Sequence, residues 1–299
     1  MTANNMSRRR FLVVGTGTAA AGLALAACGD DSGNGAKEGA VPSTSTSTST
    51  SASASPQASG ATQCVLTANA TEGPYYLDNA LVRQDITEGK QGVPLKVRLT
   101  VQDTTASCAP VAGAAVEIWH CDAWGYYSGF TTANPGGGAP AENADGSSAN
   151  DRTYLRGYQI ADANGVVELT TIVPGWYMPR VMHIHLKVHT GGVQADGTYE
   201  GGKVNFTGQL FFPDSLGDEV FALAPYNRHT GTPTKLAADS VYNGGGASDG
   251  LMTVTPVQAG TPSAGYVGTL TLGVDTTKEN GGAGGSGGGG APGGSGGSG

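Results

Sequence analysis

Apolar and polar side chains alternate without a break from Leu95 to Gln102, the pattern of a β-strand with one buried face. Further short apolar stretches follow, separated by turn-forming residues, whereas helical periodicity is almost absent and residues 221–223 are the best candidate for one helical turn. This organisation predicts an all-β fold, a β-sandwich of mixed short strands with long loops and little helix. The expected strands span residues 95–102, 114–120, 154–160, 166–172, 181–188, 209–212, 251–255 and 266–274.

Two strand pairings are expected from proximity along the chain. Residues 114–120 follow a turn containing Pro and Gly, and we expect them to lie beside residues 95–102. Residues 154–160 and 166–172 flank the turn Asp162-Ala163-Asn164-Gly165, which predicts a hairpin.

The N-terminus has the pattern of an export signal. Three arginines, Arg8 to Arg10, precede Phe11 and a weakly apolar stretch that ends in Leu-Ala-Ala-Cys28. Paired arginines before Phe-Leu resemble a twin-arginine signal, and the last four residues resemble a bacterial lipoprotein box with Cys28 as the lipidated residue. We therefore expect an exported, extracytoplasmic protein that is either anchored to the membrane by lipid or secreted.

Composition divides the chain into four parts. Residues 1–27 form the expected signal peptide, and residues 28–63 are a Ser/Thr-rich segment too poor in apolar side chains to fold, so a disordered spacer is expected. Residues 64–276 form the expected β-sandwich domain, and residues 277–299 a disordered Gly-rich tail.

The charge balance argues against nucleic acid as a partner. The chain has 24 acidic and 16 basic residues, a formal net charge of −8, which repels a phosphate backbone. No apolar run reaches the roughly 18 to 20 residues of a membrane-spanning helix once the leader is set aside. The expected membrane contact is thus limited to an N-terminal lipid anchor.

Three cysteines follow Cys28, and an oxidising compartment favours one disulfide and one free thiol. Our hypothesis pairs Cys64 with Cys108, two loop positions that flank the first long strand, and leaves Cys121 as a buried thiol. The sequence alone does not settle this connectivity.

Two histidines lie on one expected strand with a single residue between them. Side chains two apart on a strand point to the same face about 7 Å apart, so His183 and His185 can bind one metal ion. Taken alone, such a pair is more often two surface or hydrogen-bonded histidines than a pair of metal ligands. His189 has the same parity but is about 13 Å beyond His185, too far for the same ion. We assign no role to His120 or His229.

The surrounding segments, taken in order, resemble the intradiol ring-cleavage dioxygenases, non-haem ferric enzymes that open catechols between the two hydroxyl-bearing carbons. The resemblance runs from about Thr71 to Val274 and is greatest to an exported, single-chain branch of the family. The segments that carry it are Thr71–Tyr76, Val116–His120, Gly125–Ser128, Leu155–Gln159, Thr171–Tyr177, His183–His185 and Gly208–Phe212.

The resemblance implies a site. The two tyrosinate ligands fall on Tyr127, rather than Tyr126, and on Tyr177, which the substrate would release; His183 and His185 supply the imidazoles. Two further catalytic residues are implied, Arg180 beside the substrate ring and Gln209 behind the ligands. The pocket mouth would be lined by Gly73, Pro74 and Tyr75.

Physical chemistry explains why these residue types suit the implied cofactor, one Fe(III) per chain. Phenolates are hard anionic donors that suit a trivalent ion, and two of them with one hydroxide neutralise its charge. The implied reaction is cleavage of a small aromatic diol by O₂ to a muconate-type diacid. Family members are often homo-oligomers, and no feature of this sequence fixes the number of copies.

Other interpretations stay open at this point. The fold could be a non-catalytic cell-surface β-sandwich that binds polymers, or a zinc hydrolase built on His183, His185 and His120. The two tyrosines could be rim residues with wet hydroxyls, Arg180 could form a surface ion pair, and Gln209 could satisfy a backbone group at a strand end.

Overall fold

The computed structural model describes residues 64–78, 80–130, 135–140 and 153–280. The expected signal peptide, the lipidation residue Cys28, the spacer and the tail from residue 281 lie outside these ranges. No helix within the described ranges is long and apolar enough to cross a membrane.

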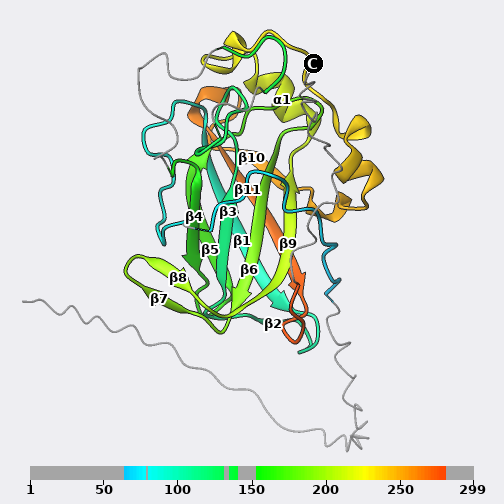
Figure 1. Ribbon diagram of the computed structural model, residues 1–299. Helices are drawn as coiled ribbons and strands as arrows, with labels where there is room; N and C mark the ends of the chain where they lie inside the picture. The colour runs from blue at the N-terminus through cyan, green and yellow to red at the C-terminus, as the bar shows by residue number, and fades with distance from the viewer. Residues whose placement is uncertain (1–63, 79, 131–134, 141–152, 281–299) are drawn as a thin grey trace, which may run out of the picture. The chain divides into compact units, whose positions relative to one another are not determined.

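The described residues form two facing β-sheets, and strands dominate over helices, which confirms the all-β prediction (Figure 1). In the first sheet β1 pairs in parallel with β11 on one side, and on the other with β5 and, further along, β2. The antiparallel strand β10 extends the sheet beyond β11. These strands are β1 (Pro94–Asp103), β2 (Ala109–Pro110), β5 (Val166–Ile172), β10 (Thr253–Pro256) and β11 (Tyr266–Val274).

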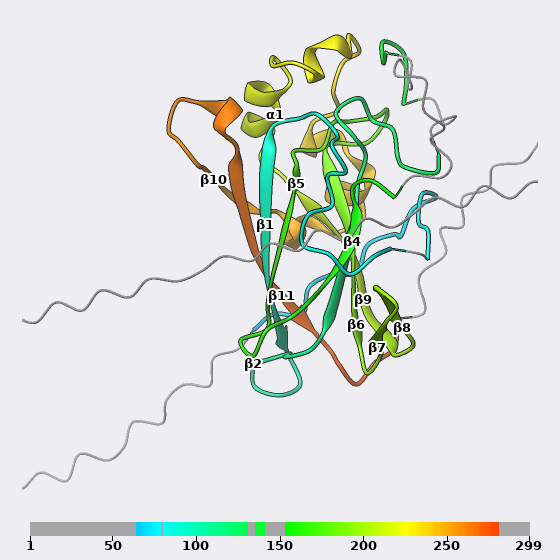
Figure 2. The ribbon, with the colours of Figure 1, turned by 90° about the vertical axis from the view of Figure 1, so that its left-hand side faces the viewer.

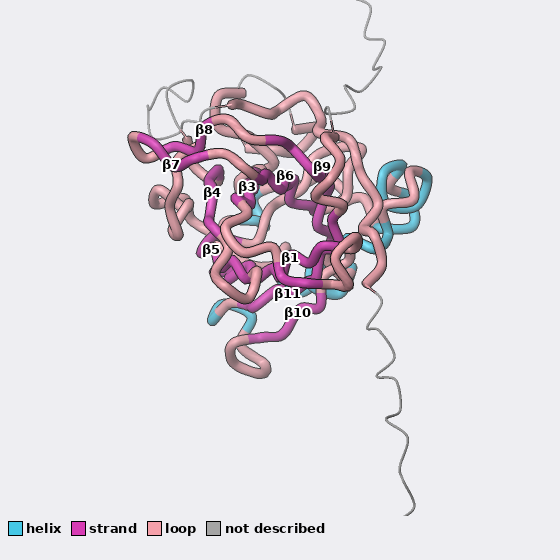
Figure 3. Tube along the Cα trace, turned by 90° about the horizontal axis from the view of Figure 1, so that it is seen from below, coloured by secondary structure: helices cyan, strands magenta, loops and turns pink. Residues whose placement is uncertain are grey.

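The second sheet is antiparallel, with the order β4-β3-β6-β9. Its strands are β3 (Ala115–Trp119), β4 (Arg156–Ile160), β6 (His183–Thr190) and β9 (Lys203–Phe211). A small ribbon of β7 (Val193–Ala195) and β8 (Thr198–Glu200) lies on the side of this sheet that faces away from the first sheet, as Figures 2 and 3 show.

Alternation places the main core between the two sheets. Leu95, Val97 and Leu99 of β1 meet Ile184 and Leu186 of β6 in one buried apolar cluster. Because side chains alternate along a strand, the residues of β6 that flank Ile184 and Leu186 project to the other face of the second sheet. That outer face is also covered, since seven of the eight residues of β6 are buried.

Both expected pairings are wrong. Residues 154–160 and 166–172 do not form a hairpin, because β4 pairs with β3 and β5 pairs with β1, so the turn at residues 162–165 carries the chain from one sheet to the other. Likewise β3 belongs to the second sheet and not beside β1. The turn signals are the same for a hairpin and for a crossing between sheets, and only long-range burial separates the two.

The helical content is low but exceeds the single turn expected at residues 221–223. Helix α1 (Asp214–Val220) ends immediately before that turn, with Phe221 as its C-cap. Short helical turns follow in the connection to β10 and before β11, namely η1 (Tyr226–Arg228), η2 (Leu236–Ala238), η3 (Ser240–Gly244), η4 (Ser248–Gly250) and η5 (Pro262–Ala264).

The two ends of the described chain are attached to the sheets. Cys64 and Cys108 form a disulfide, the pair that our hypothesis favoured, and Cys121 is a buried free thiol. At the other end, Asn280 donates a backbone hydrogen bond to Val204 in β9, so contacts with the sheet continue four residues past position 276.

Candidate metal centre

Two imidazoles meet at the start of β6 on the outer face of the second sheet. His183 and His185 have the same parity on the strand, and their Nε2 atoms lie 3.1 Å apart. The Nδ1 atom of His183 lies 2.5 Å from the Val181 carbonyl, which places its proton on Nδ1 and its lone pair on Nε2. Trp119 stacks on His185 with ring centres 5.1 Å apart and fixes the plane of that ring.

Two phenols reach the same point from two separate turns. The hydroxyl oxygen of Tyr177 lies 3.3 Å from His183 Nε2, and that of Tyr127 lies 3.5 Å from the same nitrogen. The two phenol rings meet edge to face, with centres 5.8 Å apart. The structure therefore brings together all four side chains that the resemblance proposed as metal ligands.

The two tyrosine-bearing turns are held together by backbone contacts. Gly175 donates its N–H to the Asp122 carbonyl at 3.0 Å, and the Asp122 carboxylate accepts backbone N–H groups of Trp124 and Tyr126. A Cβ on Gly175 would lie 2.5 Å from the Ala123 carbonyl oxygen, so the approach requires glycine. The spacing of the phenols thus depends on backbone geometry at this contact.

Burial controls the protonation of the four groups. It lowers the pKa of both histidines well below the usual value, and the positive charge of Arg180 acts in the same direction. Burial also raises the pKa of Tyr127 and Tyr177, although Arg180 opposes this effect. Without a cation, the site therefore holds two neutral imidazoles and two protonated phenols.

This donor set fits a trivalent cation. Donor atoms separated by 3.1 to 3.5 Å are spaced like ligands around one ion at about 2 Å. The two phenols would become phenolates on binding, which are hard donors and compensate most of a +3 charge. Among the described residues, no group of three or more His, Cys, Asp or Glu side chains is placed to share an ion, so a mixed phenol and imidazole set is the best candidate.

Arg180 and Gln209 lie beside this set and contact each other. Arg180 Nη2 donates to Gln209 Oε1 at 2.5 Å, and the Gln209 amide nitrogen donates to the Thr71 carbonyl at 2.9 Å. Arg180 also follows Tyr177 in a tight turn closed by a 2.7 Å backbone hydrogen bond. Its charge therefore lies close to the Tyr177 phenol and opposes the rise in the pKa of that group.

Asp239, the carboxylate that orients Arg180, was not among the residues predicted from the sequence. Its fully buried side chain accepts from Arg180 Nε at 2.8 Å and from the backbone N–H of Val181 at 2.9 Å, and also from the N–H groups of Val241 and Tyr242. Arg180 is thus part of a buried ion pair rather than a surface one. Nothing in the local sequence links Asp239 to an arginine 59 residues earlier.

The expected pocket-mouth residues have different positions. Gly73 lies against the His185 ring, since a Cβ there would be 3.0 Å from its Cε1 atom, and Tyr75 stacks on Tyr127 at 4.6 Å. Pro74, between them, is exposed.

Two further histidines, His120 and His229, are engaged elsewhere. Both ring nitrogens of His120 are within hydrogen-bonding distance of other groups. Nδ1 lies 2.8 Å from the Cys121 carbonyl, and Nε2 lies 2.7 Å from Thr171 Oγ1. It therefore offers no lone pair for a zinc site with His183 and His185. His229 stacks on Trp176 at 3.8 Å.

Comparison with known proteins agrees with this geometry. A family model described as dioxygenase matches residues 71–220, half of the chain. The chain belongs to the intradiol ring-cleavage dioxygenase family.

Individual relatives are more distant. The solved structure of an intradiol ring-cleavage dioxygenase from Tetranychus urticae is similar, with a TM-score of 0.59 and 29% identity, over 72% of this chain and 97% of that one. A chlorocatechol 1,2-dioxygenase of Pseudomonas putida is 26% identical over 52% of this chain and 64% of its own length. A catechol 1,2-dioxygenase of Acinetobacter lwoffii is 33% identical over 37% of this chain and 32% of its own length. The chain thus spans less than two thirds of these curated relatives.

Proposed function

We propose that this chain is an Fe(III)-dependent enzyme that cleaves a catecholic ring with O₂, between the two hydroxylated carbons, to a muconate-type diacid. The observation that carries the proposal is the convergence of two phenol oxygens and two imidazole nitrogens at the start of β6. The names of the relatives support the same reaction, since they are catechol and chlorocatechol 1,2-dioxygenases.

The ligand set gives each residue a separate task. Bound Fe(III) would supply Lewis acidity and a template that holds the diol for reaction with O₂. His183 and His185 would hold the ion as neutral imidazoles, and Tyr127, which is almost fully buried, would be the phenolate that is kept from solvent and substrate. Tyr177 is only partly buried, which supports its role as the base that leaves and takes a catechol proton on Oη.

Arg180 and Gln209 act on the substrate side. The guanidinium of Arg180 stabilises negative charge that develops on the ring, because it is oriented in advance by Asp239 and needs no rearrangement. Gln209 holds the second guanidinium nitrogen and connects it to the segment at Thr71.

The test is oxygen uptake by the purified, iron-loaded full-length chain. We expect one O₂ consumed per catechol, a diacid product, and iron rather than zinc as the dominant bound metal. Saturable catechol binding without oxygen uptake would instead identify a binding module, and a colourless protein that is replete with iron would contradict tyrosinate ligation. A panel of substituted catechols then defines the preferred ring.

We also propose that the enzyme is exported and anchored by lipid at Cys28. The basic leader and the Leu-Ala-Ala-Cys sequence support this proposal. Mass spectrometry of the mature N-terminus tests it: an acylated Cys28 is expected, whereas an intact leader or an unmodified mature N-terminus contradicts lipid anchoring.

A further inference from the structure

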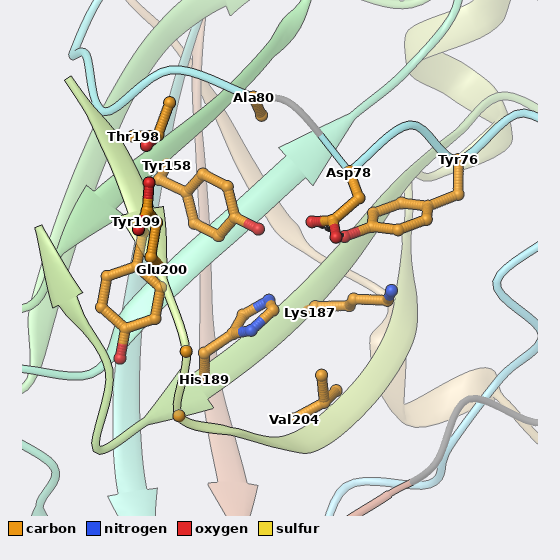
Figure 4. A pocket seen from close by; sticks show the side chains of 12 residues that line it. Tyr76, Asp78, Ala80, Tyr158, Lys187, His189, Thr198, Tyr199, Glu200 and Val204 are labelled. Carbon is orange, nitrogen blue, oxygen red and sulfur yellow. Dashed lines mark hydrogen bonds between the residues drawn. The ribbon is translucent and has the colours of Figure 1, made fainter. Parts of the chain in front are cut away.

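A second cavity, of about 620 Å³, lies on the same outer face of the sheet, beside the β7–β8 ribbon. Figure 4 shows its side chains. It is lined by Lys187 and His189 of β6, by Tyr158 of β4 and by Tyr199 of β8. It is separate from the candidate metal centre, because Tyr76 packs on Trp119 at 5.0 Å, and Trp119 in turn stacks on His185.

Aromatic rings from three strands surround part of this cavity. The Tyr158 and Tyr199 rings are stacked with centres 5.8 Å apart, and the His189 ring meets them edge-on at 5.3 and 5.9 Å. The Tyr199 hydroxyl accepts the Gly192 N–H at 2.8 Å, which holds its ring in place. Tyr158 is 3% exposed, so the partly exposed ring of Tyr199 is the more accessible π-face, and it is fixed before any ligand arrives.

Carboxylates outnumber cations around these rings. Asp78 and Glu200 line the cavity, and Glu117, which is 1% exposed, lies behind it and accepts the Tyr76 hydroxyl at 3.3 Å. Lys187 carries the one ammonium in the lining and is paired with Glu72 at 2.7 Å, which leaves the carboxylates of Asp78 and Glu200, with Glu117 behind them, in excess. Burial raises the pKa of Tyr76, and the negative charges of Glu117 and Asp78 act in the same direction.

One cation already lies on an aromatic face in this cavity. The Lys187 Nζ atom lies 3.3 Å from the centre of the Tyr76 ring, an ammonium on an aromatic face. The Tyr158 and Tyr199 rings have no such cation over them among the described residues.

A buried polar atom at this cavity also lacks a hydrogen bond. His189 is 7% exposed, and its Nε2 atom has no hydrogen-bond partner, although it lies 3.5 Å from a Glu117 oxygen. A buried polar group without a partner is costly, and a ligand or water in the cavity would relieve that cost. In Figure 4 the ring faces the open space between Tyr158 and Lys187.

We propose that this cavity binds a small organic cation carrying an alkylated ammonium group. Rigid tyrosine faces attract such a group through the ring quadrupole, and the surplus carboxylates add Coulombic attraction while opposing an anion of similar size. A bare metal ion is a poorer match, because no three acidic or histidine side chains among the described residues are placed to share one. The site is independent of the proposed ring-cleavage activity.

The test compares choline with its neutral carbon isostere, 3,3-dimethylbutan-1-ol, by calorimetric titration of the full-length chain. The two probes have nearly the same shape and differ in charge. We expect choline to bind about tenfold more tightly than the isostere. Equal affinity for the two probes, or no saturable choline binding, would overturn the proposal.

Variants then locate the site. Tyr199→Leu removes a π-face and should weaken choline binding about fivefold or more. Tyr199→Phe keeps the ring but loses the hydrogen bond from Gly192, and should weaken choline binding less than Tyr199→Leu does. Asp78→Asn should weaken choline but not the isostere. Asp196→Asn is the matched control, because Asp196 lies in the turn of the same ribbon outside the cavity lining. Choline affinity unchanged in both Tyr199→Leu and Asp78→Asn would show that the cation binds elsewhere and refute this site.

Discussion

The adjacent residues Tyr126 and Tyr127 place their hydroxyl groups in different surroundings, and only one of them reaches the candidate metal centre. The Tyr127 hydroxyl faces His183, whereas the Tyr126 hydroxyl donates to the Pro140 carbonyl at 2.9 Å. A shift of one residue in this turn would therefore replace the proposed metal donor with a phenol already engaged in the loop.

This contrast yields a prediction on colour. Tyr127→Phe removes one phenolate, so the tyrosinate-to-iron charge-transfer absorption of the iron-loaded protein should shift or bleach. Tyr126→Phe has the same change in composition and should keep the parent spectrum. Visible spectra recorded at matched iron content measure the effect, and equal spectra for the two variants would exclude Tyr127 as a ligand.

Asp239 orients Arg180, so its charge should matter for turnover more than for metal binding. Asp239→Asn keeps the shape but weakens the ion pair, and we expect kcat to fall about tenfold or more, with iron content and visible spectrum retained. The control is Asp218→Asn, which loses an exposed ion pair with Lys235 and should change kcat less than twofold. Loss of iron in Asp239→Asn would instead indicate a general structural role.

At the scale of elements, most of the longer strands could be predicted from the sequence, but their partners could not. The short strands β2, β7 and β8 were not expected, and β9 begins at Lys203 rather than at residue 209. Alternation from Leu95 to Gln102 reports burial of one face, a local property, and β1 covers those residues. Pairing depends on segments far apart, such as β1 with β11, and the expected hairpin between β4 and β5 failed for that reason. Helix α1 escaped notice because seven residues of mostly polar character give no periodicity.

Prediction of the site residues from the sequence has the same limit, because it works for local motifs and not for residues that only tertiary packing brings together. The four proposed ligands could be found because the short motifs around them resemble a known family, and the parity of His183 and His185 follows from strand geometry. Asp239 and the residues of the second cavity belong to no motif. They come together only through tertiary packing of the loops and the β7–β8 ribbon on the sheet.

The contact between the two tyrosine-bearing turns gives a prediction for these elements. Gly175→Ala would place a methyl group 2.5 Å from the Ala123 carbonyl oxygen and force the turns apart. We expect a loss of about 1–3 kcal/mol in unfolding free energy, and weaker iron binding because both phenols move. Gly244→Ala is the control, since nothing lies within 4 Å of its Cβ position. Urea unfolding and iron titration distinguish the variants, and parent-like iron affinity in Gly175→Ala would refute the coupling.

For the described domain as a whole, its two sheets leave the candidate centre and the second cavity on one outer face, covered by the N-terminal segment. That segment contributes Gly73 against His185 and Tyr76 as the wall between the two sites. Its start is joined to the end of the first sheet by the disulfide between Cys64 and Cys108. The attachment of the N-terminal segment therefore depends on a disulfide, a bond that persists under oxidising conditions.

Reduction of this disulfide should destabilise the domain. The bond closes a loop with a sequence separation of 44, for which the chain-entropy estimate is about 4 kcal/mol. We expect the urea midpoint of the full-length chain to fall by about 1–2 M when reductant is added. The double variant Cys64→Ser/Cys108→Ser should start at the lower midpoint and not respond to reductant, because Cys121 has no bridge to lose. A parent midpoint that is insensitive to reductant would mean that packing alone holds the N-terminal segment on the sheet, and the compartment would then have no influence on the stability of the site.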